Sequence, residues 1–213
     1  MTYELARRVA GARGSIIRDL LKLASEPGMI SFGGGAPDPA AYPVDLIADI
    51  TARAFLEQPK TLLAYGISEG YPPFVNSLKS YLEKTEGFDF SENELLILSG
   101  GQQCADITAK MFVNEGDTIA VERPSFVGCM NAFRSYGAKL VDIPLEDDGV
   151  NLDKLEEAFR TQKVRLFYLI STFQNPSGVT TSDKKRKAIY ELAKHYNVII
   201  FEDNPYGELR YSG

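Results

Sequence analysis

The hydrophobic residues in the second half of the chain form five short runs, separated by segments in which apolar residues recur every three or four positions. The runs are rich in leucine and β-branched residues, which favours strands, whereas the separating segments have the period of amphipathic helices. Such alternation is typical of a mostly parallel sheet flanked by helices, so we predict an α/β fold. The predicted strands cover 94–99, 118–122, 139–145, 164–171 and 197–203, and the predicted helices cover 103–113, 126–136, 151–162 and 182–196.

The ends of these helices have their own signals. Ser182 precedes an amphipathic run and is expected to cap its first turn. Gly116 and Gly137 follow helical segments, and Asn197 lies between the last helix and the last strand. Glycine and asparagine tolerate the left-handed backbone conformation that ends many helices, so we expect helix ends at these three residues.

The first part of the chain has a different pattern. The stretch 29–43 holds three consecutive glycines followed by three prolines, which suits neither a helix nor a central strand. We interpret residues 1–40 as an N-terminal helical arm. Helix candidates in this part cover 16–24, 44–56 and 74–84.

The charge, cysteine and histidine content of the chain argues against several classes of function. A net charge of −6 with interspersed signs gives no basic stripe, so we expect neither a nucleic acid nor a membrane surface as partner. Cys104 and Cys129 have no metal-like spacing, and the first residues form no apolar signal core, so we expect no metal and a cytoplasmic setting. The single histidine, His195, lies in a helical pattern, which argues against histidine-based catalysis.

Two glycine-rich segments suit the binding of anions. Gly100 and Gly101 join a predicted strand to a predicted helix, and such a junction directs backbone N–H groups at one point, where a phosphate can bind. Tight turning in any α/β fold explains the same glycines. The segment 31–39 could let a carboxylate approach backbone N–H groups closely, although a flexible linker has the same composition.

Two further segments place polar side chains where strands end. Asn175 precedes Pro176 after one predicted strand. The last predicted strand is expected to be buried on both faces and ends in Glu202 and Asp203, with Tyr206 three residues after Asp203. Ligands of open α/β sheets bind at the carboxyl ends of strands. The alternatives are a β-turn at Asn175 and a solvated strand end or helix cap at Asp203.

Together these segments, in order, resemble the class I/II aminotransferases of fold type I, which use pyridoxal phosphate. The closest branch acts on 2-aminoadipate and aromatic amino acids and is similar to kynurenine aminotransferases. The resemblance implies that residues 41–213 form the N-terminal portion of the cofactor-binding large domain, in a homodimer whose substrates are an L-amino acid and a 2-oxo acid. The segments of this chain that resemble the family are IIRDLLKL, ISFGGGAPDP, LLAYGISEGYPPF, LSGGQQCADI, VERPSFVG, STFQNPSGVT and FEDNPYGELRY.

The resemblance also implies roles around the cofactor ring. Asp203 would pair with the protonated ring nitrogen, so that the ring can accept electrons. Asn175 and Tyr206 would hydrogen-bond the phenolic oxygen, with the bond between Asn175 and Pro176 in the cis form. Phe126 would lie against the ring face, where relatives often have tyrosine.

Further implied contacts involve the phosphate and the substrate. Gly101, where relatives often have serine, and Gln102 would bind the phosphate through backbone N–H groups. Tyr65 would reach the phosphate of the neighbouring subunit. Gly35 would lie near the substrate carboxylate, and Arg18 would meet the distal group of the substrate.

The resemblance further implies a lysine that binds the cofactor covalently, in a serine-rich segment beyond the aspartate strand. No lysine of these 213 residues lies in such a segment. The arginines that would bind the phosphate and the substrate carboxylate in that later part are also absent from the sequence. We therefore expect this chain to be an inactive fragment of the parent enzyme.

Three other functions stay open from the sequence. A carbon–sulfur lyase of the same fold would share the cofactor site. A regulator that joins an aminotransferase-like ligand sensor to a DNA-binding domain would require a basic helical domain before Ser15. A dinucleotide-binding module would use Gly100 and Gly101, but the sequence has no G-x-G-x-x-G motif there, so we rank it last.

Overall fold

A computed structural model describes residues 37–212, together with 3, 4, 6, 8, 26 and 28–30. The chain divides into two compact units. The strand unit comprises Ser99–Gly213 with Met1–Ala12, and the helical unit comprises Arg13–Leu98. The predicted helix over 16–24 lies outside the described residues, as does most of the predicted arm.

The strand unit contains a sheet whose described strands follow the order β3-β2-β1-β4-β5. The neighbours from β2 to β5 are parallel, and only the short β3 is antiparallel to β2. The predicted α/β fold with a mostly parallel sheet is thereby confirmed. The strands are β1 (Thr118–Arg123), β2 (Lys139–Glu146), β3 (Gly149–Val150), β4 (Val164–Leu169) and β5 (Ile199–Glu202).

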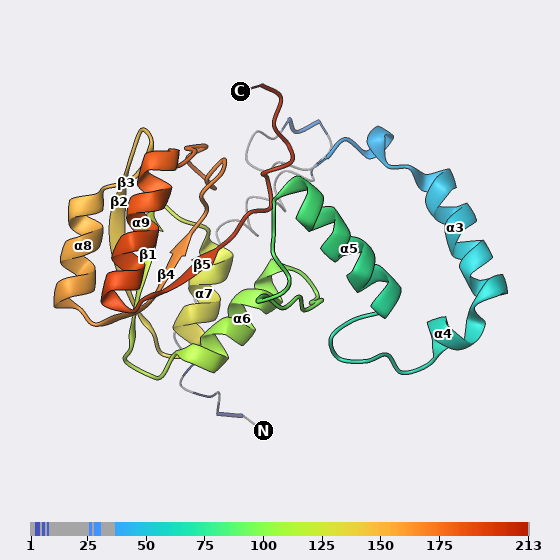
Figure 1. Cartoon of the computed structure of the whole chain (residues 1–213), viewed down its shortest axis with the longest axis horizontal. Helices are drawn as coiled ribbons and strands as arrows, with labels where there is room; N and C mark the ends of the chain where they lie inside the picture. Colours follow the sequence, from blue (N-terminus) through green and yellow to red (C-terminus); the bar gives the residue numbers. More distant parts are fainter. Residues whose placement is uncertain are drawn as a thin grey trace. The chain divides into compact units, whose positions relative to one another are not determined.

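Helices cover both faces of this sheet (Figure 1). Side chains alternate along the strands, so Ile119 and Tyr168 pack with α6 and α7, whereas Ala120 and Phe167 pack with α8 and α9. This alternation gives the unit two hydrophobic cores, one on each side of the sheet. The helices are α6 (Gly101–Phe112), α7 (Val127–Ser135), α8 (Leu152–Thr161) and α9 (Asp183–Tyr196).

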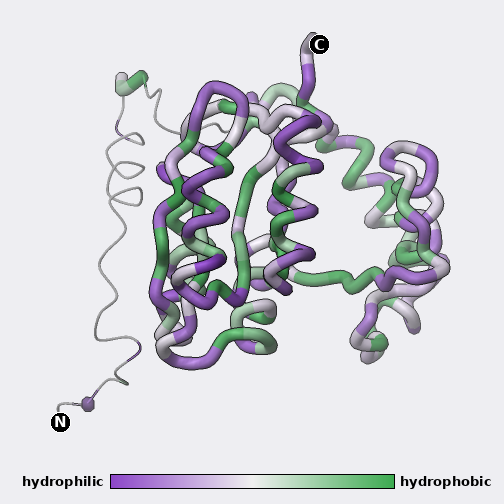
Figure 2. Tube along the Cα trace, turned by 60° about the vertical axis from the view of Figure 1, so that its left-hand side comes forward, coloured by the Kyte–Doolittle hydropathy of each residue, from purple (hydrophilic) through white to green (hydrophobic). Residues whose placement is uncertain are grey.

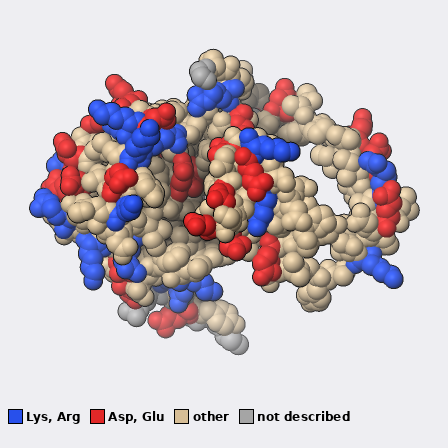
Figure 3. Space-filling model, in the orientation of Figure 1, with Lys and Arg blue, Asp and Glu red and all other residues tan. Residues whose placement is uncertain are grey.

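The helix ends agree with the sequence signals except at Gly116, because α6 ends at Phe112 and Val113 is already extended. Gly137 follows the end of α7 with φ of 77°. The side chain of Ser182 accepts a hydrogen bond from the N–H of Lys185 at the start of α9. Asn197 ends α9 in the left-handed conformation, with φ of 54°. Along the tube in Figure 2, hydrophobic and hydrophilic colours alternate within the helices of this unit, as amphipathic helices require. On the face drawn in Figure 3, acidic and basic side chains are interspersed over the same unit.

The helical unit contains a short 3-10 helix and three described α-helices. Large apolar side chains of α3, among them Val44, Ile47 and Phe55, are each at least half exposed. No helix of the described residues is long and apolar enough to cross a membrane. The elements are η1 (Pro39–Ala41), α3 (Val44–Glu57), α4 (Pro59–Leu63) and α5 (Pro72–Thr85).

Two expectations about strands were wrong. The run 94–99 forms no strand, because no other strand pairs with it among the described residues. The final strand was expected to be buried on both faces, yet the side chains of β5 are only partly buried. In the described sheet β5 has β4 as its single neighbour, which leaves its other edge uncovered.

Candidate active site

Asp203 is the first residue after β5 and lies at the carboxyl edge of the sheet. Its N–H donates to the carbonyl oxygen of Leu169 at 2.9 Å, which continues the pairing of β5 with β4. Its carboxylate oxygen Oδ2 accepts hydrogen bonds from the hydroxyl of Tyr168 at 2.9 Å and from the thiol of Cys129 at 3.9 Å. No described helix begins after Asp203, so the alternative role as a helix cap does not apply.

Both donors to Asp203 stay protonated at neutral pH. Burial raises the pKa of the Cys129 thiol to about 11 and raises the pKa of the Tyr168 hydroxyl well above its ordinary range. The two groups therefore act as hydrogen-bond donors to Oδ2. The other oxygen, Oδ1, lies 4.0 Å from the position that a Cβ on Gly101 would occupy, so it faces the start of α6.

The start of α6 provides free backbone donors. Gly100 precedes the helix with φ of 87°, a conformation that favours glycine. Among the described residues, the N–H groups of Gly101 and Gln102 have no hydrogen-bond acceptor, as is usual in the first turn of a helix. The helix dipole adds positive potential at this point. Together these groups suit an anion such as a phosphate, and they lie beside the Asp203 carboxylate.

Phe126 lies immediately before α7, in the loop that follows β1. A Cβ added to Gly128 would come within 2.5 Å of the Phe126 ring and 2.7 Å of Oε1 of Gln102. The side chain of Gln102 also donates to the carbonyl oxygen of Gly128 at 3.1 Å. The absence of a side chain at Gly128 therefore lets the aromatic ring and the start of α6 approach each other closely.

Asn175 and Tyr206 come from different loops and meet. The side-chain amide of Asn175 donates to the hydroxyl oxygen of Tyr206 at 3.1 Å. The bond between Asn175 and Pro176 is cis, as expected, and the bond between Arg123 and Pro124 is cis as well, which the sequence did not indicate. Among the described residues, no acceptor takes the second N–H of Asn175 or the hydroxyl proton of Tyr206, so the pair has two donors for a ligand.

Three further predicted residues, Tyr65, Gly35 and Arg18, belong to the range of the helical unit. Tyr65 follows α4 in the helical unit and is fully exposed. Gly35 and Arg18 are outside the described residues. Sequence reasoning missed Tyr168, because a tyrosine within an apolar strand has the pattern of a core residue, and it considered Cys129 only as a possible metal ligand.

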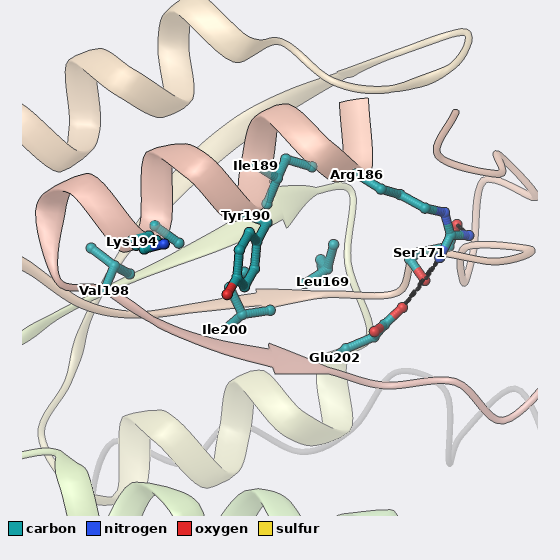
Figure 4. Close-up of a pocket in the computed structure, with 10 residues that line it drawn as sticks. Leu169, Ser171, Arg186, Ile189, Tyr190, Lys194, Val198, Ile200 and Glu202 are labelled. Carbon is teal, nitrogen blue, oxygen red and sulfur yellow. Dashed lines mark hydrogen bonds and ion pairs between the residues drawn. The ribbon is translucent and has the colours of Figure 1, made fainter. Parts of the chain in front are cut away.

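Arg186 on α9 is a further residue that the sequence did not indicate, because it lies in a basic run that resembles a solvated helix face. Its guanidinium donates to the carbonyl oxygens of Ser171 and Thr181 and to the hydroxyl oxygens of Ser171 and Thr172. Figure 4 shows Arg186 beside Ser171 and Glu202, at one end of a groove between α9 and β5. The groove contains none of the predicted site residues, so we assign Arg186 to the support of the loop after β4.

Comparisons with known proteins identify the family of the chain. Residues 27–213 match the family model for aminotransferases of class I and II. An aromatic-amino-acid aminotransferase of Thermococcus litoralis is 40% identical over 100% of this chain and 53% of its own length. A 2-aminoadipate transaminase of Thermus thermophilus is 36% identical over 93% of this chain and 49% of its own length.

Solved structures give the same result. The crystal structure of Pyrococcus horikoshii kynurenine aminotransferase, described as a complex with PMP, superposes with a TM-score of 0.91 at 37% identity, over 98% of this chain and 53% of that one. Among more distant relatives is the probable rhizopine catabolism regulatory protein MocR of Rhizobium meliloti, 29% identical over 88% of this chain and 37% of its own length. The chain spans about half the length of the aminotransferases that it matches. By the match over 27–213, it belongs to the class I and II aminotransferase family.

Proposed function

We propose that the protein containing these 213 residues moves an amino group from an L-amino acid to a 2-oxo acid with pyridoxal phosphate, and that this chain provides the half of the site that faces the cofactor. The observation that supports this most is the carboxylate of Asp203, which is fixed on Oδ2 by Tyr168 and Cys129. Its Oδ1 lies beside Gly101 and has no hydrogen-bond partner among the described residues. A carboxylate held in this way suits a protonated ring nitrogen.

The other described groups fit the remaining parts of the cofactor. The free N–H groups of Gly101 and Gln102 suit its phosphate, and the donor pair of Asn175 and Tyr206 suits its phenolic oxygen. The ring of Phe126 offers an apolar face for a planar heterocycle. When bound, the cofactor supplies the electron acceptor for the pair of electrons left by the substrate α-proton.

We further propose that the chain alone does not catalyse transfer. No described lysine hydrogen-bonds or pairs with Asp203, Asn175 or Tyr206. The covalent attachment of the cofactor and the proton transfer at the substrate α-carbon need such a base. We infer that the parent protein is a homodimer, with Tyr65 as a contact to the neighbouring site, and its full exposure together with the exposed apolar residues of α3 supports association.

The binding claim is tested with pyridoxamine 5'-phosphate, which needs no lysine for attachment. Equilibrium dialysis of the 213-residue chain is expected to show binding that Asp203→Asn weakens about tenfold or more, because a charge-assisted hydrogen bond is worth about 1.5–3 kcal/mol. Asp142→Asn, on the exposed side chain that pairs with Arg123, is the matched control. Equal affinity of the two variants would refute the assignment of Asp203.

The reaction is tested separately. The chain mixed with pyridoxal phosphate, an L-amino acid and a 2-oxo acid is expected to form no new keto acid, and turnover would contradict the proposed inactivity of the isolated chain. The full-length protein is expected to transfer the amino group of aromatic amino acids or 2-aminoadipate, by analogy with the named relatives. Release of sulfide or pyruvate from sulfur amino acids in place of transfer would favour the lyase alternative.

A ligand-sensing regulator is a second candidate, since the relatives include MocR of Rhizobium meliloti. Such a protein would bind the cofactor with the same residues but would act through a DNA-binding part. An electrophoretic mobility assay of the full-length protein, combined with the transfer assay, distinguishes the two. Specific DNA binding without amino transfer would favour the regulator.

A further inference from the structure

The side chain of Gln174 joins two loops of the candidate site. It is 2% exposed, and its amide N–H groups donate to Oε2 of Glu122 at 3.2 Å and to the carbonyl oxygen of Pro124 at 2.7 Å. Its amide oxygen accepts from the N–H of Ser177 at 2.9 Å and from the Ser177 hydroxyl at 2.6 Å. All four hydrogen-bonding positions of the side chain are therefore occupied.

The two loops that Gln174 joins are those that carry candidate cofactor contacts. Pro124 lies two residues before Phe126, in the loop after β1, and Gln174 directly precedes Asn175, in the loop after β4. The backbone of Gln174 closes its own turn, because its N–H donates to Val179 at 2.8 Å and its carbonyl oxygen accepts from Gly178 at 2.6 Å. The turn is thus closed by its own backbone hydrogen bonds, and the side chain of Gln174 connects it to the neighbouring loop.

Glu122 anchors this bridge from within β1. Its side chain is 1% exposed, and Oε2 accepts both from Gln174 and from the N–H of Ile170 at 2.9 Å. Its other oxygen, Oε1, has no partner among the described residues. An apolar side chain at this position would leave two buried donors unpaired, which is unfavourable. Glu122 therefore holds Gln174 in the orientation in which its amide reaches Pro124.

We infer that Gln174, held by Glu122, is a positioning residue that fixes Asn175 relative to Phe126 and so sets where the cofactor ring meets the amide of Asn175. This inference rests on the proposed binding of the cofactor at that site. The bridge itself is a property of the chain without cofactor. The two can therefore be tested by separate measurements on the same 213-residue protein.

Hydrogen–deuterium exchange of the chain without cofactor tests the bridge. Gln174→Met is expected to raise exchange about tenfold in both loops, at the amides of 125–128 and 173–180, while amides of α8 serve as the internal reference for the global fold. Ser177→Ala is the matched control, because it removes the two hydrogen bonds of the Ser177 hydroxyl, both within the turn, and leaves the bonds to Glu122 and Pro124. It is expected to affect the turn alone. Faster exchange of the turn alone in Gln174→Met would overturn the inference.

A milder variant covers the case in which Gln174→Met unfolds the chain. Gln174→Asn keeps an amide but is one methylene too short to bond both Glu122 and the turn, so the same rise in both loops is expected. Glu122→Gln keeps an acceptor for Gln174 and Ile170, so its amides are expected to exchange at the wild-type rates. Glu122→Met removes this acceptor and is expected to raise the exchange rates of both loops. The same exchange in these two Glu122 variants would contradict the anchoring role.

The circular dichroism that the protein induces in the absorption band of pyridoxamine 5'-phosphate tests the consequence for the cofactor. At saturation, Gln174→Met is expected to change the intensity of this band, because the ring is held differently, and to weaken binding about tenfold. Glu122→Gln, which keeps the acceptor for Gln174, is expected to show the wild-type spectrum. Weaker binding with an unchanged saturated spectrum would show a purely structural role and overturn the inference. If the wild type does not bind pyridoxamine 5'-phosphate, the proposed function is refuted. The hydrogen–deuterium exchange measurement would still show whether Gln174 joins the two loops.

Discussion

The hydroxyl of Tyr168, inside β4, donates to Oδ2 of Asp203, just beyond β5, at 2.9 Å. The donor is fully buried, so it cannot exchange this bond for one to water. The bond fixes one carboxylate oxygen and leaves the other directed at the start of α6. A residue that packs in the core of the sheet therefore also orients the charged group of the candidate site.

Tyr168→Phe removes only this hydroxyl. We expect a loss of about 1.5–3 kcal/mol in the free energy of unfolding, the usual value of a hydrogen bond to a charged group, and weaker binding of pyridoxamine 5'-phosphate. Urea denaturation and equilibrium dialysis measure the two effects. Tyr190→Phe, at a side chain that is 58% exposed, is the matched control and should change neither. Equal stability of the two variants would contradict the role of the bond.

Gly128→Ala should disturb the aromatic side of the site. The new methyl group would lie 2.5 Å from the Phe126 ring, so the ring has to move. We expect a loss of about 1–3 kcal/mol in stability, as for other overpacked positions, together with reduced affinity for pyridoxamine 5'-phosphate. Gly66→Ala is the control, because nothing lies within 4 Å of its added methyl group. Unchanged affinity in Gly128→Ala would argue against a ring contact by Phe126.

Glu122 should make stability depend on pH. Burial raises its pKa from 4.5 to about 7, against the opposing effect of the hydrogen bonds from Ile170 and Gln174. A carboxyl group with a raised folded-state pKa stabilises the fold fully below its unfolded-state pKa, and this stabilisation is lost as the pH rises through the folded-state value.

The unfolding free energy of the wild type relative to Glu122→Gln should therefore fall between pH 4.5 and 7, by about 1.4 kcal/mol per pH unit and about 3 kcal/mol in total. Urea titrations at several pH values in this window measure the difference. A difference that stays constant, or grows with pH, would show that the Glu122 carboxyl is ionised in the folded chain throughout.

Arg186→Lys should destabilise the loop after β4. A lysine cannot donate to Ser171, Thr172 and Thr181 at once, because it lacks the planar fork of the guanidinium. We expect a loss of about 2 kcal/mol in stability, within the range for hydrogen bonds of charged groups. Lys184→Met, on an exposed residue of the same helix, should have little effect. Thermal unfolding of the two variants gives the comparison.

Much of the fold could be predicted from the sequence, because helices and strands depend on local periodicity. The predicted helix over 182–196 matches α9 within one residue, with its cap at Ser182 and its end at Asn197. The prediction of a strand over 94–99 was wrong, because a strand forms only against a partner strand and local periodicity does not show whether one is available. The uncovered edge of β5 reflects the same dependence.

The same distinction between local and tertiary information applies to the candidate site. The sequence by itself determined which residues stand at strand ends and at the start of α6, among them Gly101, Asn175 and Asp203, because these positions follow from element boundaries. Only the tertiary structure decided which side chains form hydrogen bonds that orient these residues. Cys129 reaches Asp203 across 74 positions and Gln174 reaches Glu122 across 52, and no local pattern encodes such pairs. Their partners are set by strand order and register, which depend on the packing of both cores.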